Sequence, residues 1–293
     1  MLRQPGRLFG EATASFYTSR TPYAADPAVP LWSNLGYWAE ARTAVDAQIE
    51  LARLLGRSGR LAAGDELLDV GCGCGDQDLL WLREWNLKRI VAIDVTPLRV
   101  ELARARVARA GLADRIDVRV GTATELPFGD RSFDKITALE CATHFNSRED
   151  FLREAHRVLR PGGRLALTDF TPLAGSPPSP ADRLLQRLAR RLIGIPAANV
   201  YPAASYAARL WRIGFERVEI RSIADHVFPG CMRYRAMLAA GRSSSAVVEM
   251  EARDFVASQW NSAWHDGLGL GDYILVTADK PRIPTSPAIT SSG

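Results

Sequence analysis

The chain has 293 residues, a formal net charge of +4 and 47% apolar residues, enough to build a sizeable core. Its four cysteines make no disulfide framework for this length, and no window approaches the ~18 to 20 apolar residues that span a bilayer. The excess positive charge is spread over scattered arginines, so nucleic-acid binding is not indicated. The N-terminus lacks the apolar core of a signal peptide, and we expect a cytoplasmic protein with no membrane partner.

Alternating strand and helix patterns begin near residue 65. In chain order they predict a strand at 65–70, a helix at 78–85, a strand at 89–95, a helix at 98–112, strands at 115–121 and 133–140, a helix from 148 that Pro161, Gly162 and Gly163 end, and a strand at 164–170. Strands that alternate with helices of ~10 to 16 residues indicate an α/β fold. We expect a mostly parallel, doubly wound, Rossmann-like sheet with helices on both faces.

A proline-rich segment with an Arg/Leu helix breaks this alternation, and we expect it to be a lid over the carboxyl edge of the sheet. A helix at 203–214, a strand at 215–223, a helical stretch around 231–266 and a strand at 273–280 then complete a seven-stranded sheet. The predicted organisation is a helical arm or cap at 1–60, the ligand-binding core at 61–171, the lid at 172–202, the rest of the sheet with cap helices at 203–280, and a disordered tail at 281–293.

The segment LLDVGCGCGDQD (67–78) joins the first strand to the first helix of the core. Its glycines let the backbone approach a ligand, and the helix start offers free N–H groups to an anion. Cys72 and Cys74 have no second cysteine pair and no histidine near in sequence, so a metal site is incomplete and no metal is expected. The spacing G-x-G-x-G differs from the G-x-G-x-x-G of dinucleotide loops, which disfavours NAD. Asp94, at the end of the second strand, can accept both hydroxyls of a ribose and supports an adenosine-containing ligand.

Four segments occur in an order that resembles a known family: ELLDVGCGCGDQD, VAIDVT, GTATELPFGDRSFDKITALE and REAHRVLRPGGRLALTDF. They are similar to the motifs of class I S-adenosylmethionine-dependent methyltransferases. The small-molecule branch, with sugar and polyketide O-methyltransferases and sterol C-methyltransferases, is the most similar. The resemblance covers roughly residues 31–172. It implies an enzyme that uses S-adenosyl-L-methionine and releases S-adenosyl-L-homocysteine.

The resemblance also implies which residues bind the cofactor. They are Tyr37 and Trp38 ahead of the core, Asp69, Gly71, Cys72, Gly73, Gly75 and Gln77 in the glycine loop, Asp94 and Val95 after the second strand, and Thr122, Ala123 and Glu140 after the third and fourth strands. Thr122 departs from the aspartate that the family often has there, which leaves the N–H group of Ala123 for the adenine edge.

Methyl transfer to a hydroxyl needs alignment of the two reactants and a base for the proton. His144 follows the fourth strand and Asp169 ends the fifth, so both are expected at the carboxyl edge, where ligands bind. Natural-product sugar O-methyltransferases similarly carry a histidine and an aspartate there, which implies His144 as general base assisted by Asp169. An aspartate beside the histidine would orient the imidazole. The alternative is that His144 caps the next helix and Asp169 ends a strand at a solvated turn.

Aromatic side chains outside the core motifs would suit a bulky, apolar acceptor, or they simply pack the cap onto the sheet. The candidate pocket residues are Tyr17, Tyr23, Phe170, Trp211 and Tyr234. The leading hypothesis is O-methylation of a small-molecule acceptor, a secondary metabolite such as a glycoside or polyketide. C-methylation of an olefin or enol of a terpenoid or polyketide is the alternative. Three further functions are less favoured but stay open: a nucleic-acid methyltransferase, a non-catalytic cofactor-binding protein and an NAD oxidoreductase. The sequence also leaves open whether the protein forms a homo-oligomer.

Overall fold

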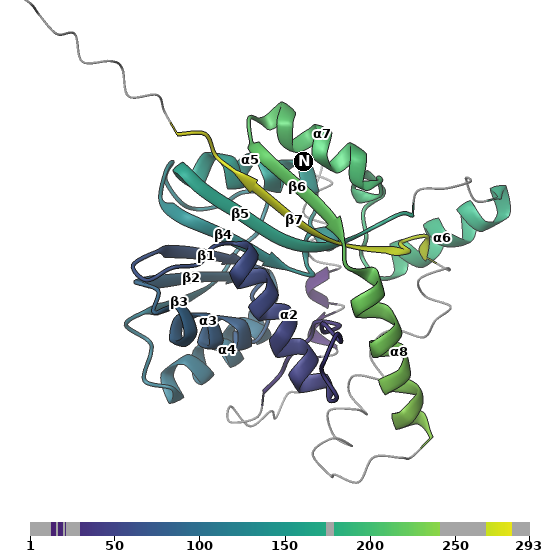
Figure 1. Cartoon of the computed structure of the whole chain (residues 1–293), viewed down its shortest axis with the longest axis horizontal. Coiled ribbons are helices and arrows are strands. Elements are labelled where there is room, and N and C mark those ends of the chain that lie inside the picture. The colour runs from purple at the N-terminus through teal and green to yellow at the C-terminus, as the bar shows by residue number, and fades with distance from the viewer. Residues whose placement is uncertain are drawn as a thin grey trace, which may run out of the picture.

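The structure is a computed structural model that describes residues 13–15, 17–19, 21, 30–173, 179–240 and 268–282. Seven strands form one sheet in the order β3-β2-β1-β4-β5-β7-β6, and helices pack on both faces (Figure 1). Strand β7 is antiparallel to both of its neighbours, and the other neighbouring pairs are parallel. The predicted α/β class with a seven-stranded, mostly parallel, Rossmann-like sheet is confirmed.

The strands are β1 (Glu66–Val70), β2 (Arg89–Asp94), β3 (Ile116–Val120), β4 (Phe133–Leu139), β5 (Leu159–Thr171), β6 (Glu216–Ser222) and β7 (Asp272–Asp279). The helices are α2 (Ala44–Ser58), α3 (Asp76–Trp85), α4 (Pro97–Arg109), α5 (Arg148–Val158), α6 (Pro180–Leu192), α7 (Ala203–Ile213) and α8 (Ala224–Ala239), with single 3₁₀ turns η1 (Ala142–His144) and η2 (Ala197–Asn199). The chain leaves β1 toward β2 and β3, and later fills the other side with β4 and β5. The carboxyl ends of β1 and β4 therefore form the switch point at which such sheets bind ligands.

Two hydrophobic cores, one on each face, hold the layers together. Leu51 of α2 and Trp81 of α3 are fully buried in the first, where the Trp81 indole N–H also donates to the Ala52 carbonyl. Phe151 of α5 and Tyr206 of α7 are fully buried in the second. The apolar stripes that predicted these helices are the surfaces that cover the sheet.

Helix α5 ends three residues before the proline that was expected to end it. Strand β5 begins at Leu159, which pairs with Phe133, and the register is irregular before regular pairing resumes at Arg164. Gly162 has a φ of +81°, a conformation that glycine adopts without strain. The segment that was assigned to a helix end is therefore an irregular beginning of the strand.

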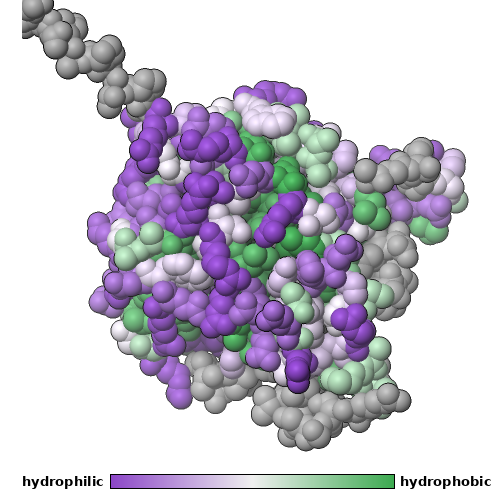
Figure 2. Space-filling model, in the orientation of Figure 1, coloured by the Kyte–Doolittle hydropathy of each residue, from purple (hydrophilic) through white to green (hydrophobic). Residues whose placement is uncertain are grey.

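The Arg/Leu segment does form a helix, α6, and Figure 1 shows it projecting from the body of the molecule. None of its residues is buried, and its leucines at 184, 185, 188 and 192 are more than half exposed. On the face seen in Figure 2 the surface is largely hydrophilic, with a hydrophobic strip over the region of β6 and β7. No helix among the described residues is both long and apolar enough to cross a bilayer.

Some sequence predictions fall outside the described residues. They concern Tyr23, most of the N-terminal arm before residue 30, the helical stretch between 241 and 267, and the tail from 283 onward. Within the described part, α8 begins at Ala224, seven residues before the predicted helical stretch.

Candidate active site

The glycine loop connects β1 to α3 at the switch point. Gly71, Gly73 and Gly75 have φ values of +80°, +57° and +79°, a region that favours glycine. The Gly71 and Cys72 N–H groups both donate to the Ile93 carbonyl of β2, which fixes the start of the loop. A Cβ at position 71 would lie 2.6 Å from Cys141 Sγ, so only glycine fits there.

A buried carboxylate supports the loop from below. Asp69 is completely buried, and its two oxygens accept from Thr137 Oγ1 at 2.8 Å and Gln77 Nε2 at 2.9 Å. Gln77 Nε2 also donates to the Cys72 carbonyl at 2.9 Å, so it connects the strand to the loop. Asp78 is a second fully buried carboxyl group beside Asp69, and burial raises the pKa of both. The loop therefore rests on a network of buried polar groups.

The two cysteines of the loop are buried free thiols. Burial raises the pKa of Cys74 to about 11 and that of Cys72 well above its ordinary value, so both are protonated at neutral pH. Within the part of the chain that the structure describes, no three His, Cys, Asp or Glu side chains gather as metal ligands. In this loop both cysteines act as small packing side chains.

Asp94 stands at the end of β2, beside the loop. Its Oδ2 accepts the Gly73 N–H at 3.0 Å and its Oδ1 accepts the Thr96 N–H at 2.8 Å, with 8% of the residue exposed. Each carboxylate oxygen keeps a further lone pair for a ligand hydroxyl. A Cβ at Gly73 would have Ser33 Oγ at 3.7 Å and Arg99 Nη1 at 3.8 Å as its nearest neighbours. An additional atom therefore fits beside this glycine without a clash, and we call this space the cradle. These residues fit an adenosine-containing cofactor.

The turn after β3 is at the same edge of the sheet as Asp94, because β3 is the neighbour of β2. Thr122 bridges to Glu125, and its hydroxyl lies 3.2 Å from that of Thr124. Ala123 is buried in the core on the α5 side, and Val95 is half-buried after β2. The turn is thus held by its own threonines, in place of the aspartate expected from the family pattern.

Tyr37 and Trp38 contact helix α8. The Tyr37 ring lies 5.1 Å from that of His226, and the Trp38 ring lies 5.3 Å from that of Tyr234. The backbone N–H of Trp38 also donates to the His226 carbonyl at 2.7 Å. The indole ring of Trp38 fills the space that a side chain at position 230 would need, so Gly230 has none. In the described residues, this pair joins the arm to α8, and the predicted contact with the cofactor stays a prediction.

Glu140 follows β4 with a φ of +54°, which is rare for a residue with a side chain. Its Oε1 accepts the Leu35 N–H at 2.8 Å and the hydroxyl of Tyr273. Burial raises the pKa of Glu140 to about 7. A strained, half-buried carboxyl group at the carboxyl edge is typical of a functional position.

His144 is the last residue of η1, five residues beyond the end of β4, and is only 8% exposed. Its ring meets the Tyr17 ring edge-on at 5.5 Å between centroids. The alternative that His144 caps α5 is wrong, because Ser147 is the N-cap and its hydroxyl accepts the Asp150 N–H at 3.1 Å. The structure thus places the imidazole between the end of β4 and the N-terminal helical residues.

The imidazole of His144 is neutral at physiological pH. Burial lowers the pKa of His144 to about 4, although hydrogen bonds with the backbone of Ile193 and Gly194 act in the opposite direction. The charges of Arg99 and Arg148 lower the pKa further. A neutral imidazole has a ring nitrogen that can accept a proton.

Asp169 does not bind the imidazole as expected, because its carboxylate is occupied by other groups. Its Oδ2 lies 2.8 Å from Arg148 Nε and 3.3 Å from the Tyr206 hydroxyl, and its Oδ1 accepts the Phe170 N–H at 2.8 Å. Both Asp169 and Arg148 have fully buried side chains, so the alternative of a solvated turn is wrong as well. The buried guanidinium needs an anionic partner, and Asp169 provides it.

Arg148 and Asn199 are the structural residues that the sequence did not identify. Arg148 donates from its backbone N–H to Asn199 Oδ1 at 2.8 Å and from Nη1 to the Asn199 carbonyl. Asn199 Nδ2 in turn donates to the carbonyls of Thr143 and Phe145, on either side of His144. A chain of polar contacts therefore runs from Asp169 through Arg148 and Asn199 to the backbone around the histidine. No sequence motif signals it, because Asn199 is 51 residues from its partner.

The predicted pocket residues have different outcomes. Tyr17 lies between His144 and Arg99, whose guanidinium carbon stands 4.3 Å from the ring centroid. Phe170 is buried against Tyr273 at 5.0 Å, and Tyr234 is buried against Trp38.

Trp211 does not belong to the pocket. It is 59% exposed near the end of α7, where the chain turns into the first residues of β6. Because β6 runs parallel to β5, this is the edge of the sheet opposite the site.

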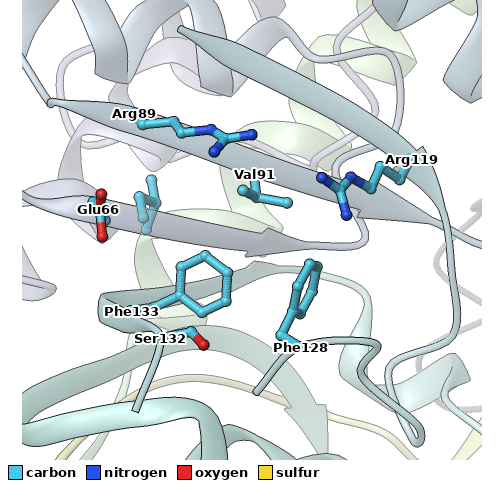
Figure 3. A pocket seen from close by; sticks show the side chains of 8 residues that line it. Glu66, Arg89, Val91, Arg119, Phe128, Ser132 and Phe133 are labelled. Carbon is cyan, nitrogen blue, oxygen red and sulfur yellow. The ribbon is translucent and has the colours of Figure 1, made fainter. Parts of the chain in front are cut away.

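A surface cavity of about 190 Å³ lies over β1 and β2, between the strand residues Glu66, Arg89 and Arg119 and the rings of Phe128 and Phe133 (Figure 3). None of the predicted site residues lines it. Asp117 binds both arginines, at 2.8 and 2.5 Å, and offsets their charge. The cavity therefore plays no part in the candidate site.

Together, the sheet order, the glycine loop at the switch point and the acid at the end of β2 define a Rossmann-like enzyme that binds a nucleoside-containing cofactor. The family model described as a methyltransferase domain matches residues 68–167, from within β1 to within β5.

Known proteins identify the family further. Erythromycin 3''-O-methyltransferase of Saccharopolyspora erythraea is 40% identical over 205 residues, which cover 69% of this chain and 67% of that protein. The 27-O-demethylrifamycin SV methyltransferase of Amycolatopsis mediterranei is 34% identical over 262 residues, 88% of this chain and 94% of that one. This chain belongs to the S-adenosylmethionine-dependent methyltransferases and is an enzyme of that family.

A solved structure agrees on the fold. Geranyl diphosphate C-methyltransferase from Streptomyces coelicolor A3(2), in complex with Mg²⁺, geranyl diphosphate and S-adenosyl-L-homocysteine, superposes with a TM-score of 0.64. The match covers 93% of this chain and 97% of that one at 15% identity. At this identity the likeness shows the fold alone. The cofactor follows from membership of the family, whose members use S-adenosyl-L-methionine.

Proposed function

We propose that the enzyme methylates a hydroxyl group of a small-molecule secondary metabolite, such as a glycoside or a polyketide, with His144 as the general base. The observation that carries this proposal is a buried, neutral imidazole at the carboxyl edge, held among Tyr17, Ile193 and Gly194. The two relatives described above are named as an erythromycin 3''-O-methyltransferase and a methyltransferase of 27-O-demethylrifamycin SV, which supports the same reaction class.

S-adenosyl-L-methionine supplies a methyl group that is already activated by its positive sulfur. The glycine loop after β1 would bind this cofactor, and Asp69 and Gln77 would support the loop through their hydrogen bonds. Asp94 would accept the ribose hydroxyls, because its oxygens already face the Gly73 backbone. Val95, Thr122 and Ala123, after β2 and β3, would line the adenine side.

The chain's own contribution to the reaction is alignment and proton removal. An alcohol is a poor nucleophile at neutral pH, so a base that takes its proton as the new bond forms accelerates the transfer. His144 would accept that proton on a ring nitrogen. In this proposal Asp169 assists indirectly: through Arg148 and Asn199 it fixes the backbone on both sides of His144. Tyr17 and Phe170 would contact the acceptor or close the site around it.

The test compares His144→Gln with His156→Gln. His156 is the matched control, because it lies on α5 with its ring 5.0 Å from Phe215, away from the site. We expect His144→Gln to lower kcat on hydroxylated acceptors about 10²–10⁴-fold, while S-adenosyl-L-homocysteine still binds in calorimetry and His156→Gln keeps full turnover. Full turnover in His144→Gln would reject the base. Methylation at carbon in the product, found by NMR, would replace the proposal with the C-methyltransferase alternative.

A further inference from the structure

Arg99 is a half-buried cation at the cofactor site that the proposed reaction does not use. It lies in the first turn of α4, three residues after the N-cap residue Thr96. The positive end of the helix dipole is at this turn, so a cation here does not stabilise the helix. The position of Arg99 is therefore explained by its contacts outside α4.

The Arg99 guanidinium holds the described N-terminal residues 13–15, 17–19 and 21, which we call the arm segment. Its Nε donates to Thr21 Oγ1 at 3.1 Å, and its Cζ lies 4.3 Å from the centroid of the Tyr17 ring, a cation–π contact. Thr21 is buried, and its hydroxyl donates to the Tyr17 carbonyl at 2.8 Å. One side chain of α4 thus contacts two residues of the arm segment that are also bonded to each other.

The same guanidinium lines the cradle. Its Nη1 lies 3.8 Å from the place of a Cβ at Gly73, and the Gly73 N–H donates to Asp94 Oδ2 at 3.0 Å. The cradle therefore adjoins the carboxylate that would accept the ribose hydroxyls. The cofactor carries oxygen acceptors in its ribose and in the carboxylate of its methionine part, and the N–H groups of a guanidinium bind either kind.

We propose that Arg99 couples the arm segment to the cofactor: its Nη groups bind an oxygen of the cofactor, while its Nε and its planar face hold Thr21 and Tyr17. Arg99 is a positioning residue for the arm segment. A bound cofactor fixes the guanidinium, so the side-chain freedom that attachment of the arm costs has already been lost. Cofactor binding therefore strengthens the attachment of the arm, and an attached arm strengthens cofactor binding by the same factor.

This coupling reaches the proposed base. The Tyr17 ring meets the His144 ring edge-on, at 5.5 Å between centroids. Because Arg99 holds Tyr17, the bound cofactor would complete one wall around the imidazole before methyl transfer.

The experiment measures hydrogen–deuterium exchange of the full chain, in a peptide that covers the arm segment, with and without S-adenosyl-L-homocysteine. The Ser19 and Thr21 N–H groups donate to the carbonyls of Ser15 and Thr18, so their exchange reports on this segment. We expect saturating S-adenosyl-L-homocysteine to slow this exchange about tenfold in the native protein and less than about twofold in Arg99→Gln. Calorimetry should show an affinity about tenfold weaker in Arg99→Gln.

Two further variants separate this coupling from a general loss of charge or stability. Arg109→Gln is the matched control, because it removes the same charge from the exposed last turn of α4, and it should keep both the protection and the affinity. Thr21→Val removes the acceptor of Arg99 Nε and leaves the cradle intact, so it should reduce the protection by cofactor. The double variant should lose no more than Arg99→Gln alone, because both changes break the same contact.

The two kinds of cofactor oxygen are distinguished with 5′-methylthioadenosine, which has the ribose and lacks the methionine carboxylate. Weaker binding of both ligands to Arg99→Gln would assign the Arg99 contact to the ribose. Weaker binding of S-adenosyl-L-homocysteine alone would assign it to the carboxylate.

Equal protection of the arm peptide in Arg99→Gln and the native protein would overturn the coupling, and so would an unchanged affinity or a native arm that the ligand does not protect. If Arg99→Gln does not fold, full protection in Thr21→Val overturns it instead. The measurement involves no acceptor and no methyl transfer, so its failure is distinct from failure of the proposed base.

Discussion

Arg148 and Asp169 form a completely buried ion pair, with Arg148 Nε 2.8 Å from Asp169 Oδ2. The same guanidinium donates to the Phe170 carbonyl at 3.2 Å and lies over the Tyr201 and Tyr206 rings. It joins β5 and α5 to η2, next to the turn that carries His144. The acid that the sequence assigned to the histidine thus acts on the scaffold around it.

Breaking this pair from one side should destabilise the fold. We expect Asp169→Asn to lower the free energy of unfolding by about 3–5 kcal/mol, because the Arg148 charge stays buried without its counterion. The control is Arg153→Gln, which removes the exposed Arg153–Glu149 pair on α5 and should cost less than about 1 kcal/mol. Urea denaturation measures both, and equal losses would contradict the assigned importance of burial.

Asn199 should affect turnover more than binding. In Asn199→Asp the two donors to Thr143 and Phe145 are replaced by an acceptor, which repels both carbonyls and shifts the His144 backbone. A displacement of about 1 Å costs roughly 10²-fold in rate, so kcat should fall by that order while the affinity for S-adenosyl-L-homocysteine is kept. Steady-state kinetics and calorimetry separate the two. A loss confined to KM would show that Asn199 shapes the acceptor pocket instead.

The low pKa of His144 predicts a specific loss of stability in acid. Burial lowers it to about 4, from an ordinary value of 6.5, so the unfolded chain binds the proton more tightly between these values. Stability from this group is complete above about pH 6.5 and is lost as pH falls through about 4, by about 3 kcal/mol in total.

His144→Phe removes this titration. The difference in unfolding free energy between the variant and the native protein should therefore change by that amount across the window. A constant difference would mean that the imidazole is solvated.

Gly71 can be separated from ordinary glycine strain by a matched pair. Gly71→Ala and Gly64→Ala both place a side chain on a residue with left-handed backbone, because φ is +80° at Gly71 and +88° at Gly64. Only at Gly71 does the new Cβ meet an atom, Cys141 Sγ at 2.6 Å, whereas nothing lies within 4 Å at Gly64. We expect about 1–2 kcal/mol lost in Gly64→Ala and about 1–3 kcal/mol more in Gly71→Ala.

S-adenosyl-L-homocysteine binding should weaken only in Gly71→Ala. Thermal unfolding and calorimetry decide, and the same affinity in both variants would show that the loop adapts to the side chain.

The sequence by itself determined the fold class and the position of the glycine loop at the carboxyl edge of the sheet. Alternating apolar strands and amphipathic helices have their own periodicities, and glycines at 71, 73 and 75 after a strand specify a left-handed loop whatever surrounds them. Asp94 could be placed from the sequence for the same reason, because the end of a parallel strand is always at the carboxyl edge.

Only the tertiary structure decided the partners of the buried charges. Asp169 and His144 are at the same edge of the sheet, yet the carboxylate pairs with the Arg148 guanidinium of α5. The Asn199 amide of η2 donates to the backbone beside His144 instead. Trp211 was assigned by composition, while the direction of β6 placed it at the opposite edge. Such pairings depend on side chains that are tens of residues apart, and local periodicity carries no information about which of several nearby groups will neutralise a buried charge.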